Sequence, residues 1–416
     1  MKTHRVVVTG MGTVSPAGLG VPKLWEAVRA GRSRGSAITR FDPSRNACRI
    51  AAETPPLPVP VKPDTEDVHF SRTHRYALVA ATEAMGQAGT TGFSPERAGV
   101  CIGSTTIGIE ALEAAFNATL IPSDGPEIPH EEGPAPDLFS AYSGAGISAA
   151  LAGRFGFRGP VSTLSTGCAS GLDAIGCALD TIRRGEADLM VAGGADAAVD
   201  PIILTAFDVV RALTRRNDAA EQASRPFDQG RDGFLLAEGA GILVLEEAEH
   251  ARRRGAVPLA EILGFASNCH AFHMTSMPED GKILADCLDL AIADAGLSPD
   301  GIDYINAHGS STPLNDRVET LAYKEVFGDR VRRIPISSTK SVIGHPLGAA
   351  GAIQAVVCVM AIGDSWLPPT ANLDEPDPEC DLDYVPRTGR SHPFRHALAN
   401  ANSFAGIHSG LVIGAI

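Results

Sequence analysis

The sequence lacks the features that mark several common protein classes. The first residues, "MKTHRVVVTGMG", hold only a short apolar run before glycine, so we expect no secretion signal. No uninterrupted run of about 18 apolar residues occurs, and we therefore expect no transmembrane helix. There is no Walker motif, and the glycine-rich stretches "GMGTVSPAG" and "VAGGADA" lack the GxGxxG spacing of dinucleotide-binding loops. These absences disfavour membrane proteins, P-loop enzymes and nicotinamide-dependent enzymes.

Disulfide and zinc frameworks are also missing. The 8 cysteines are scattered through 416 residues and form no CxxC pair. The stretch "NCHAFHM" groups Cys269, His270 and His273, but three ligands without a fourth are more typical of a structural role than of a metal site. We therefore expect reduced thiols, no metal, no bound cofactor and a cytoplasmic location.

A surplus of basic residues is absent as well. The formal net charge is −14, which argues against nucleic acid or an anionic membrane as the main partner. A local basic patch can still bind an acidic protein. Hydrophobic residues make up 44% of the chain and charged residues 20%, which is typical of a globular protein.

What the sequence does contain is a repeated pattern of short β-branched runs that end in glycine and alternate with helical patterns. Examples are "RVVVTGMG", "AGVCIGSTTIG", "ADLMVAGGADA", "GAGILVLEE", "IDYINAHGSS", "IPISSTKSVIGH" and "SGLVIGAI". The pattern predicts a layered α/β fold with mostly parallel or mixed sheets. A helix that ends at Gly255 and a strand that begins at Leu259 divide the chain into halves 1–255 and 256–416, joined in one unit. The proline-rich stretches 53–64 and 122–137 are expected to be surface loops.

The stretch "LSTGCASGLDAIGCALDTIRRG" contains two cysteines in different settings. Apolar residues recur every three or four positions and define one face of a helix that ends near Gly185, namely Leu172, Ile175, Leu179 and Ile182. Cys177 falls in the middle of this helix and is expected to be core packing. Cys168 falls where a strand stops and the helix begins, so the positive end of the helix dipole would favour its thiolate. Small neighbours would let a substrate approach Cys168, although a buried structural cysteine fits the local pattern too.

The second half offers partners for such a nucleophile. His308 in "NAHGSSTPLND" and His345 in "KSVIGHPLGAAGA" both follow apolar runs in glycine-rich surroundings. The apolar helix after His345 would fix its position. Lys340 and Glu319 lie close enough in sequence to tune the imidazoles, although each is equally compatible with an exposed surface charge.

A cysteine with two neutral histidines fits one reaction better than others. The thiolate would accept an acyl group from a thioester, and two imidazole N–H donors would stabilise an enolate or oxyanion. Together they would catalyse carbon–carbon bond formation after a decarboxylation, without a metal or redox cofactor. A cysteine hydrolase needs only one histidine and an orienting Asn or Asp.

With these motifs in order, the chain resembles the β-ketoacyl-[acyl carrier protein] synthases of the thiolase-like fold, in the decarboxylating Cys-His-His class. The resemblance runs almost from end to end through "RVVVTGMGTVSPAG", "STGCASGLDAIG", "MVAGGADA", "TRRNDAAEQASRPFDQGRDGF", "NAHGSSTPLND", "STKSVIGHPLGAAGA" and "PPTANLDEPDPECDLDYVP". It implies two similar halves in an α-β-α-β-α arrangement, with the nucleophile in the first half and both histidines in the second.

The resemblance also implies a role for each site residue. Cys168 would accept the acyl group, and His308 and His345 would hold the malonyl thioester, with Lys340 and Glu319 in the supporting network. The backbone N–H groups of Cys168 and Phe404 would form the oxyanion hole. Phe404 would also be the gate of the acyl pocket, and Phe234 would lie beside the malonyl site. Thr275, Ser310 (in place of a usual threonine) and Thr312 would contact the phosphopantetheine arm.

"STGCASGLDAIG", "FHMTSM" and "DPECDLDYVP" look most like the ketosynthase subunit of type II polyketide synthases, which pairs with a chain length factor that lacks the cysteine. A homodimeric fatty-acid elongation synthase is the alternative, and a scaffold without activity is a further one. The resemblance names acyl carrier protein as the other partner. A basic cluster, Arg211 with Arg215 and Arg216, is the expected docking site, with a smaller cluster at Arg72 and Arg75.

One departure from the family concerns the gating loop. The family's "GFGG" reads "FAGIHSG" here. The bulkier Ile407 and His408 would alter gate motion or the pocket mouth, or else they are neutral differences in a surface turn. The sequence gives neither the starter unit nor the length and kind of the product chain.

Overall fold

A computed structural model describes residues 4–57, 70–113 and 141–416 of the chain. Within them the main feature is an 11-stranded sheet with the strand order β11-β10-β14-β15-β9-β1-β8-β7-β5-β6, where β2 pairs only with β1. The strands of this sheet are β1 (Val6–Ser15), β2 (Gly18–Leu19), β5 (Ala98–Gly103), β6 (Val161–Leu164), β7 (Leu189–Asp196), β8 (Gly239–Glu247), β9 (Ala260–Cys269), β10 (Tyr304–Asn306), β11 (Ile336–Ser337), β14 (His396–Asn402) and β15 (Ile407–Gly414).

The sheet repeats one pattern in its two parts. From the outer edge of the sheet inward, the first part runs β6, β5, β7, β8, β1, which are its third, second, fourth, fifth and first strands along the chain. From the other edge inward, the second part runs β11, β10, β14, β15, β9, which is the same order. The pairing directions match too: the second strand of each part pairs in parallel with the third and fourth, and the others pair antiparallel. β1 and β9 pair with each other and join the two parts.

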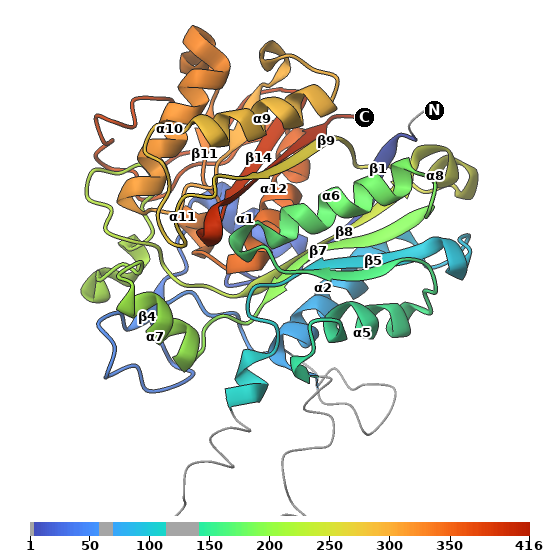
Figure 1. Cartoon of the computed structure of the whole chain (residues 1–416), viewed down its shortest axis with the longest axis horizontal. Helices are drawn as coiled ribbons and strands as arrows, with labels where there is room; N and C mark the ends of the chain where they lie inside the picture. Colours follow the sequence, from blue (N-terminus) through green and yellow to red (C-terminus); the bar gives the residue numbers. More distant parts are fainter. Residues whose placement is uncertain (1–3, 58–69, 114–140) are drawn as a thin grey trace, which may run out of the picture.

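Helices cover this sheet in layers (Figure 1). The helices are α1 (Val21–Ala30), α2 (Arg72–Ala88), α5 (Gly146–Phe155), α6 (Ser170–Arg183), α7 (Pro201–Val209), α8 (Ala248–Arg254), α9 (Lys282–Asp294), α10 (Pro313–Phe327), α11 (Lys340–Ile343) and α12 (Ala350–Asp364). α6 and α12 contact strands of both parts, whereas α2 and α5 pack on the first part, α9 packs on the second, and α10 packs on α9. This is the expected α-β-α-β-α arrangement.

The inner helices α6 and α12 occupy equivalent places in the two parts. Each follows the third strand of its part and begins with a short 3₁₀ turn, Gly167–Ala169 before α6 and Leu347–Ala349 before α12. The two turns contact each other. A Cβ placed on Gly171 would lie 2.7 Å from the carbonyl oxygen of Gly348, so glycine permits this close approach. The N-termini of the two helices therefore meet at the centre of the molecule.

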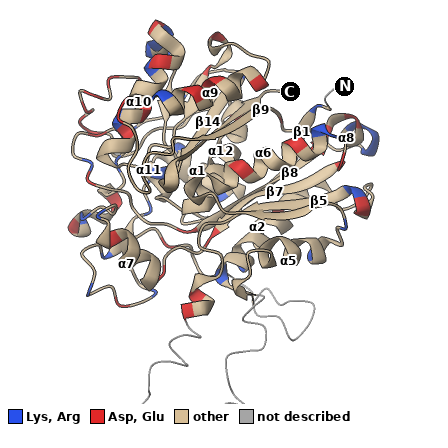
Figure 2. Cartoon of the chain, viewed as in Figure 1, with Lys and Arg blue, Asp and Glu red and all other residues tan. Residues whose placement is uncertain are grey.

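The core lies around these helices. Leu172, Ile175, Leu179 and Ile182 are fully buried, as their spacing predicted, and they share a cluster with residues of α12 and of both parts of the sheet. Cys177 is partly buried and packs against the same cluster, which confirms the expectation that it is a packing residue. Charged side chains lie mostly on helices and loops at the periphery (Figure 2).

The segment Leu347–Asp364 is apolar and long enough to cross a membrane by length and composition, with a mean hydropathy of 1.7. We expected no such segment, because the sequence has no uninterrupted run of about 18 apolar residues. Of these residues 83% are buried inside the fold. The segment is thus the core helix predicted behind His345.

"IPISSTKSVIGH" was expected to be one strand, but only Ile336–Ser337 is extended, and the helix α11 follows, so His345 comes after a helix rather than a strand. The buried side chains of Thr339 and Lys340 bond to the neighbouring loop and begin a helical turn there. Of the two proline-rich stretches, residues 58–64 and 122–137 lie outside the described residues.

Candidate active site

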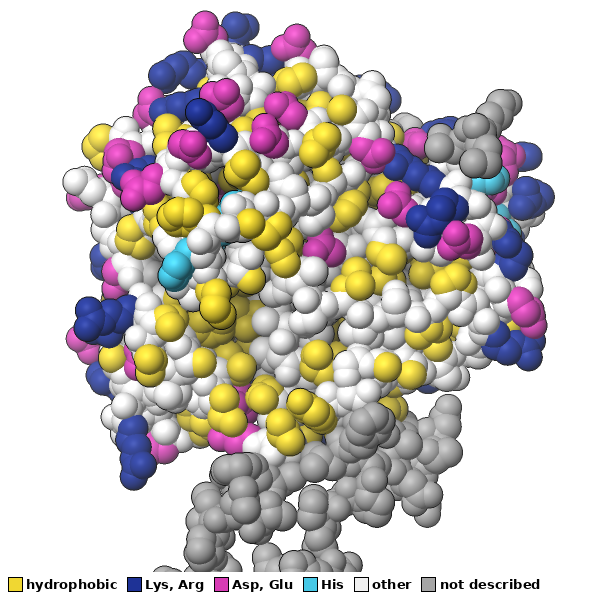
Figure 3. Space-filling model, in the orientation of Figure 1, with side chains coloured by type: hydrophobic (Ala, Val, Ile, Leu, Met, Phe, Trp, Pro, Cys, Tyr) yellow, Lys and Arg dark blue, Asp and Glu magenta, His cyan; other side chains and the backbone are white. Residues whose placement is uncertain are grey.

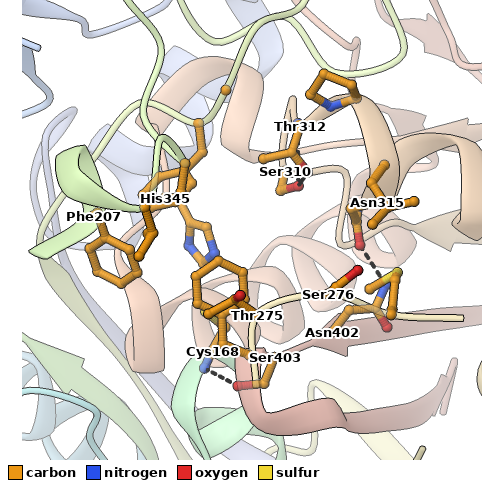
Figure 4. Close-up of a pocket in the computed structure, with 18 of the residues that line it drawn as sticks. Cys168, Phe207, Thr275, Ser276, Ser310, Thr312, Asn315, His345, Asn402 and Ser403 are labelled. Atoms are coloured by element: carbon orange, nitrogen blue, oxygen red, sulfur yellow. Dashed lines mark hydrogen bonds between the residues drawn. The ribbon is translucent and has the colours of Figure 1, made fainter. Parts of the chain in front are cut away.

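A cavity of about 300 Å³ opens at the meeting point of α6 and α12 (Figure 4). It collects most of the predicted site residues from both halves of the chain. Its lining includes Cys168, Phe234, Thr275, His308, Ser310, Thr312, His345, Phe404 and Arg211. Lys340 and Glu319 are buried behind it, with 1% and 0% of their surfaces exposed. The structure therefore brings together side chains that are more than 130 positions apart in the sequence.

Cys168 lies in the 3₁₀ turn that leads from β6 into α6. Its backbone N–H donates a hydrogen bond to Ser403 Oγ at 3.0 Å. Burial raises the pKa of the thiol to about 12, while the charge of Lys340 and the backbone N–H groups of Cys168 and Phe404 lower it. Our expectation of a thiolate stabilised by the helix end is wrong for the resting enzyme, because desolvation of the charged form is the larger effect.

The rings of His308 and His345 lie side by side in the lining of the cavity, in edge-to-face contact. Their ring centroids are 5.2 Å apart and the rings are at 79°. His345 is held by its backbone, which accepts a hydrogen bond from Ala237 N at 3.1 Å and donates one to Leu235 O at 2.8 Å. Burial, with Lys340 nearby, keeps the pKa of both imidazoles well below 6.5, so both rings are neutral near pH 7.

Lys340 supports His308 rather than the cavity itself. Its ammonium donates to His308 O at 2.7 Å and to Gln354 Oε1 at 3.1 Å, and it lies 3.5 Å from His308 Nδ1. Burial lowers the pKa of Lys340 to about 8, and Glu319 opposes the shift. An ammonium is only a donor, so Nδ1 of His308 is the acceptor and its proton sits on Nε2.

Glu319 fixes the loop that carries His308. Its carboxylate accepts hydrogen bonds from the backbone N–H groups of His308 at 2.7 Å and Gly309 at 2.8 Å. It also accepts from Tyr323 Oη at 2.7 Å and from Asn400 Nδ2 at 2.8 Å. These contacts are to the backbone and to neutral groups, so Glu319 positions His308 and does not bond to the imidazole.

Aromatic residues border the cavity next to the histidines. Phe234 meets His345 edge-on with centroids 5.2 Å apart. Phe207, which sequence reasoning missed, lies 5.2 Å from Phe234 and 6.0 Å from Phe404 between ring centroids. Phe207 was missed because nothing in the α7 sequence distinguishes an aromatic that lines a cavity from one that packs in a core. Phe404 is 38% exposed at the rim.

Hydroxyl groups line the other side. Ser310 and Thr312 share a hydrogen bond of 2.8 Å, and Thr275 lies on the exposed loop that follows β9. Arg211 reaches the cavity and is exposed, whereas Arg215 is exposed but does not line it. Arg72 bonds to Glu238 and to the carbonyl of Val199, which gives it a structural role.

The sequence matches family models over both halves of the chain. The profile of the beta-ketoacyl synthase N-terminal domain matches residues 3–251, and that of the C-terminal domain matches residues 259–374. The chain belongs to the beta-ketoacyl synthase family. It is therefore a ketosynthase, an acyltransferase of the 3-oxoacyl-[acyl carrier protein] synthase class, as the sequence predicted.

Relatives place this ketosynthase near the type II polyketide enzymes. It is 45% identical to a Streptomyces cyaneus protein named as polyketide beta-ketoacyl synthase 1, with 99% of this chain and 98% of that one covered. It is also 39% identical to 3-oxoacyl-[acyl-carrier-protein] synthase 2 of Coxiella burnetii, with both chains covered in full (100% each).

Solved structures agree in fold. A type II polyketide ketosynthase, solved with its acyl carrier protein and bound to a hexaketide, superposes with a TM-score of 0.91 at 37% identity over 100% of both chains. The ishigamide ketosynthase/chain length factor gives a TM-score of 0.87 at 34% identity, again over 100% of both chains. The thiolase-like ketosynthase fold predicted from the sequence is thereby confirmed.

Sequence reasoning missed a polar chain in this ketosynthase. His408 Nδ1 bonds to Asn402 Oδ1 at 3.0 Å, Asn402 Nδ2 donates to Asn315 Oδ1 at 2.9 Å, and Asn315 Nδ2 donates to Glu319 Oε2 at 3.1 Å. His408 is 2% exposed, so it is not part of a surface turn. Burial and the nearby His270 lower its pKa to about 4, which keeps it neutral. His408 thus links the gating loop to the group that holds His308.

Proposed function

We propose that this ketosynthase condenses a Cys168-bound acyl chain with a malonyl unit and releases carbon dioxide and a 3-oxoacyl product. The single observation that carries this proposal is the convergence of Cys168, His308 and His345 on one cavity. A neutral imidazole pair beside a thiol supplies both a nucleophile and two N–H donors for an oxygen that becomes negative.

The first step loads the enzyme. Cys168 Sγ attacks the carbonyl carbon of an acyl thioester, the bond from that carbon to the carrier sulfur breaks, and the thiol proton ends on the departing sulfur. The backbone N–H groups of Cys168 and Phe404 stabilise the oxygen that is negative in between. Because burial raises the pKa of the thiol to about 12, the proton leaves only as the new bond forms.

The second step makes the carbanion. The malonyl thioester carbonyl accepts hydrogen bonds from the imidazoles of His308 and His345, and the bond to the carboxylate breaks to release carbon dioxide. The electron pair of that bond forms an enolate. Lys340 keeps the proton of His308 on Nε2, and Glu319 holds the loop, so the donor is aimed before the substrate arrives.

The third step forms the carbon–carbon bond. The enolate carbon attacks the acyl carbonyl on Cys168, and the bond to Sγ breaks, which returns the thiol after it takes up a proton. Phe404 and Phe234, which both line the cavity, would border its acyl and malonyl sides. Thr275, Ser310 and Thr312 line it too and would contact the phosphopantetheine arm that carries the substrates. The reaction needs no further bound cofactor.

The product is proposed to be a polyketide rather than a fatty acid. The similarity to a polyketide beta-ketoacyl synthase 1 and to the ketosynthase that binds a hexaketide supports this choice. The ishigamide ketosynthase is paired with a chain length factor, and this chain retains Cys168, so it would be the active member of such a heterodimer. The Coxiella enzyme at 39% identity keeps the homodimeric fatty-acid synthase as the second candidate.

The acyl carrier protein is proposed to dock at the mouth of the cavity. Arg211 at the mouth, with Arg215 beside it, would bind the acidic acyl carrier protein. Hydrophobic side chains gather over the centre of the face in Figure 3, and Lys and Arg lie mostly toward its edges.

Residues 1–255 would form the half with the nucleophile and 256–416 the half with the histidines. The free cysteines favour a cytoplasmic location.

The test is intact-mass analysis after incubation with an acylated carrier protein, alone and after co-expression with a neighbouring homologue that lacks the cysteine. An acyl adduct on wild-type enzyme, absent from Cys168→Ala, is expected. If no adduct forms on Cys168, the nucleophile assignment is wrong and the scaffold alternative gains support. Extension beyond one condensation only with the homologue present would favour the polyketide heterodimer over the fatty-acid homodimer.

A further inference from the structure

At the floor of the cavity the backbone N–H of Cys168 is already occupied. It donates to Ser403 Oγ at 3.0 Å, and Figure 4 shows this bond directly below the open space. Ser403 is 4% exposed and lines the cavity beside Cys168. Neither the motifs nor the proposed mechanism assigned this serine a role.

The hydrogen bond to Ser403 involves the same Cys168 N–H that the proposed mechanism assigns to the oxyanion hole. In the proposed loading step this N–H and that of Phe404 stabilise the carbonyl oxygen of the acyl thioester. Phe404 lines the same cavity as Cys168, and its N–H lowers the pKa of the Cys168 thiol. Ser403 Oγ therefore accepts the hydrogen bond that the substrate oxygen would accept.

The serine hydroxyl fits tightly into this position. Gly167 has φ of +61°, and a Cβ placed on it would lie 2.1 Å from Ser403 Oγ. Only a glycine at position 167 leaves space for the hydroxyl against the turn that carries Cys168. The hydroxyl and a substrate oxygen cannot both accept the Cys168 N–H in good geometry, because an amide has one hydrogen.

Ser403 is also part of the turn that carries the gating phenylalanine. Its backbone N–H donates to Ile407 O at 2.8 Å, and its carbonyl accepts from Gly406 N at 3.2 Å. The next residue is Phe404, and Ala405 within the turn has φ of +65°. A movement of this turn therefore carries the Ser403 hydroxyl and the Phe404 ring together.

We propose that Ser403 Oγ masks the oxyanion donor of Cys168 in the resting enzyme and that an acyl thioester must displace it. The displacement links the movement of Phe404 to the formation of the oxyanion hole. Both N–H groups can therefore stabilise the negative oxygen of the thioester only when the acyl pocket opens. Ser403 is thus a positioning residue that restrains loading. This inference rests on the proposed function, because it concerns the acylation of Cys168.

The consequence is a selective effect on one kind of reaction. Attack on a thioester develops a negative oxygen, whereas alkylation of the same thiol by iodoacetamide displaces iodide and develops none. Removal of the hydroxyl frees the amide for the thioester oxygen. Acylation should therefore become faster by about 3- to 10-fold, the factor of one neutral hydrogen bond, while alkylation should change less than about 2-fold because it makes no use of the oxyanion hole.

The experiment compares both reactions of Cys168 in Ser403→Ala, Ser403→Gly, Ser403→Thr and wild type. Hexanoyl-N-acetylcysteamine is the acyl donor, iodoacetamide is the alkylating probe, and intact mass gives both rates. Ser403→Thr keeps a hydroxyl at the position and is the matched control, since φ of −114° and ψ of 151° suit threonine. We expect faster acylation in the alanine and glycine variants and a rate near wild type in the threonine variant.

Each other outcome overturns the inference. Equal increases of acylation and alkylation would mean that Ser403 only limits access to the thiol. Slower acylation in both hydroxyl-free variants would mean that the hydroxyl assists the substrate oxygen instead of competing with it. Unchanged rates would remove any role in loading. Wild-type enzyme that forms no acyl adduct at all would instead refute the proposed function, so the two failures are distinguishable.

Discussion

The imidazole rings of His308 and His345 stand nearly at right angles, with centroids 5.2 Å apart. Two rings so close and so deeply buried cannot both carry a charge without strong repulsion and desolvation. Accordingly, the pKa of each lies well below 6.5. The neutral pair therefore suits the proposed role of two hydrogen-bond donors to an enolate better than that of an acid–base couple.

The first prediction follows from this pairing. His308→Ala and His345→Ala should each lower the rate of malonyl-carrier decarboxylation by about 100- to 1000-fold, the usual effect of losing one oxyanion donor. Cys168→Ala should keep decarboxylation and lose acylation, because the enolate needs the imidazoles and not the thiol. Release of labelled carbon dioxide measures the first reaction. Unchanged decarboxylation in both histidine variants would rule out the enolate-stabilising role.

The second prediction concerns pH. Because both imidazoles stay neutral, decarboxylation should be flat from about pH 6 to 7.5 and show no step at the ordinary histidine value of about 6.5. It should fall as the pH rises through about 8, where Lys340 loses its proton. Lys340→Met should remove this upper step, and a step that persists in the variant would assign it to another group.

The upper step should not reflect unfolding through Lys340. Its pKa is lower in the folded protein than in the unfolded chain, so the unfolded chain binds more protons between about pH 8 and the ordinary value of 10.5. Raising the pH through that window therefore stabilises the fold as far as this group is concerned. A thermal unfolding midpoint measured at pH 7 and pH 9 separates loss of activity from loss of structure.

The third prediction tests Glu319 as a holder of the His308 loop. Glu319→Gln replaces one acceptor oxygen by an NH₂ group that faces donors, so buried hydrogen bonds are lost or opposed. We expect destabilisation of about 2–4 kcal/mol, with a fall in the rate constant for decarboxylation and little change in KM. Tyr323→Phe, which leaves the carboxylate in place and removes one hydroxyl that bonds to Glu319 and to Asn400 Oδ1, is the matched control at about 1 kcal/mol. Equal effects of the two variants would argue against a special role for the carboxylate.

Much of the fold could be read from the sequence because local patterns decide it. The apolar face of Leu172, Ile175, Leu179 and Ile182 and the end of a helix at Gly255 follow from periodicity and helix-end chemistry, and both are observed. The short strand at Ile336–Ser337 was not predictable in this way. Its continuation into α11 depends on tertiary hydrogen bonds, such as Asn306 Nδ2 to Thr339 Oγ1 at 2.9 Å.

The site divides along the same line. Cys168, His308 and His345 each stand in a short motif whose neighbouring residues already indicate a chemical role, and the fold brings the three to one cavity. Phe207 and Asn402 carry no local signal, because their roles arise only when α7 and the β14 end approach that cavity. The pKa of Cys168 was misjudged for a related reason: the helix end is visible in the sequence, and the burial that opposes it is not.

The fourth prediction addresses how α6 and α12 meet. Gly171→Ala would place a Cβ 2.7 Å from the carbonyl oxygen of Gly348, so the helix ends must separate. We expect the free energy of unfolding to fall by about 1–3 kcal/mol. The condensation rate of the protein that remains folded should fall as well, because Cys168 and His345 move apart. Gly153→Ala is the control, since no described atom lies within 4 Å of its added Cβ in α5 and alanine favours a helix. Full activity in Gly171→Ala would show that the contact does not set the site geometry.

The fifth prediction concerns the carrier protein and the two arginines near the mouth. Arg211 is exposed and lines the cavity, while Arg215 is exposed and stands outside it. Arg211→Ala should raise the KM for malonyl-carrier by about 3- to 10-fold with kcat unchanged, and Arg215→Ala should raise it less, because a rim charge mainly affects encounter with an acidic partner. Arg253→Ala on α8, at the opposite end of the molecule from α7 in Figure 1, should leave the KM unchanged. At about 0.5 M salt the differences should shrink, since screening shortens the reach of exposed charges. Equal KM values for Arg211→Ala and Arg253→Ala at low salt would move the docking site away from this mouth.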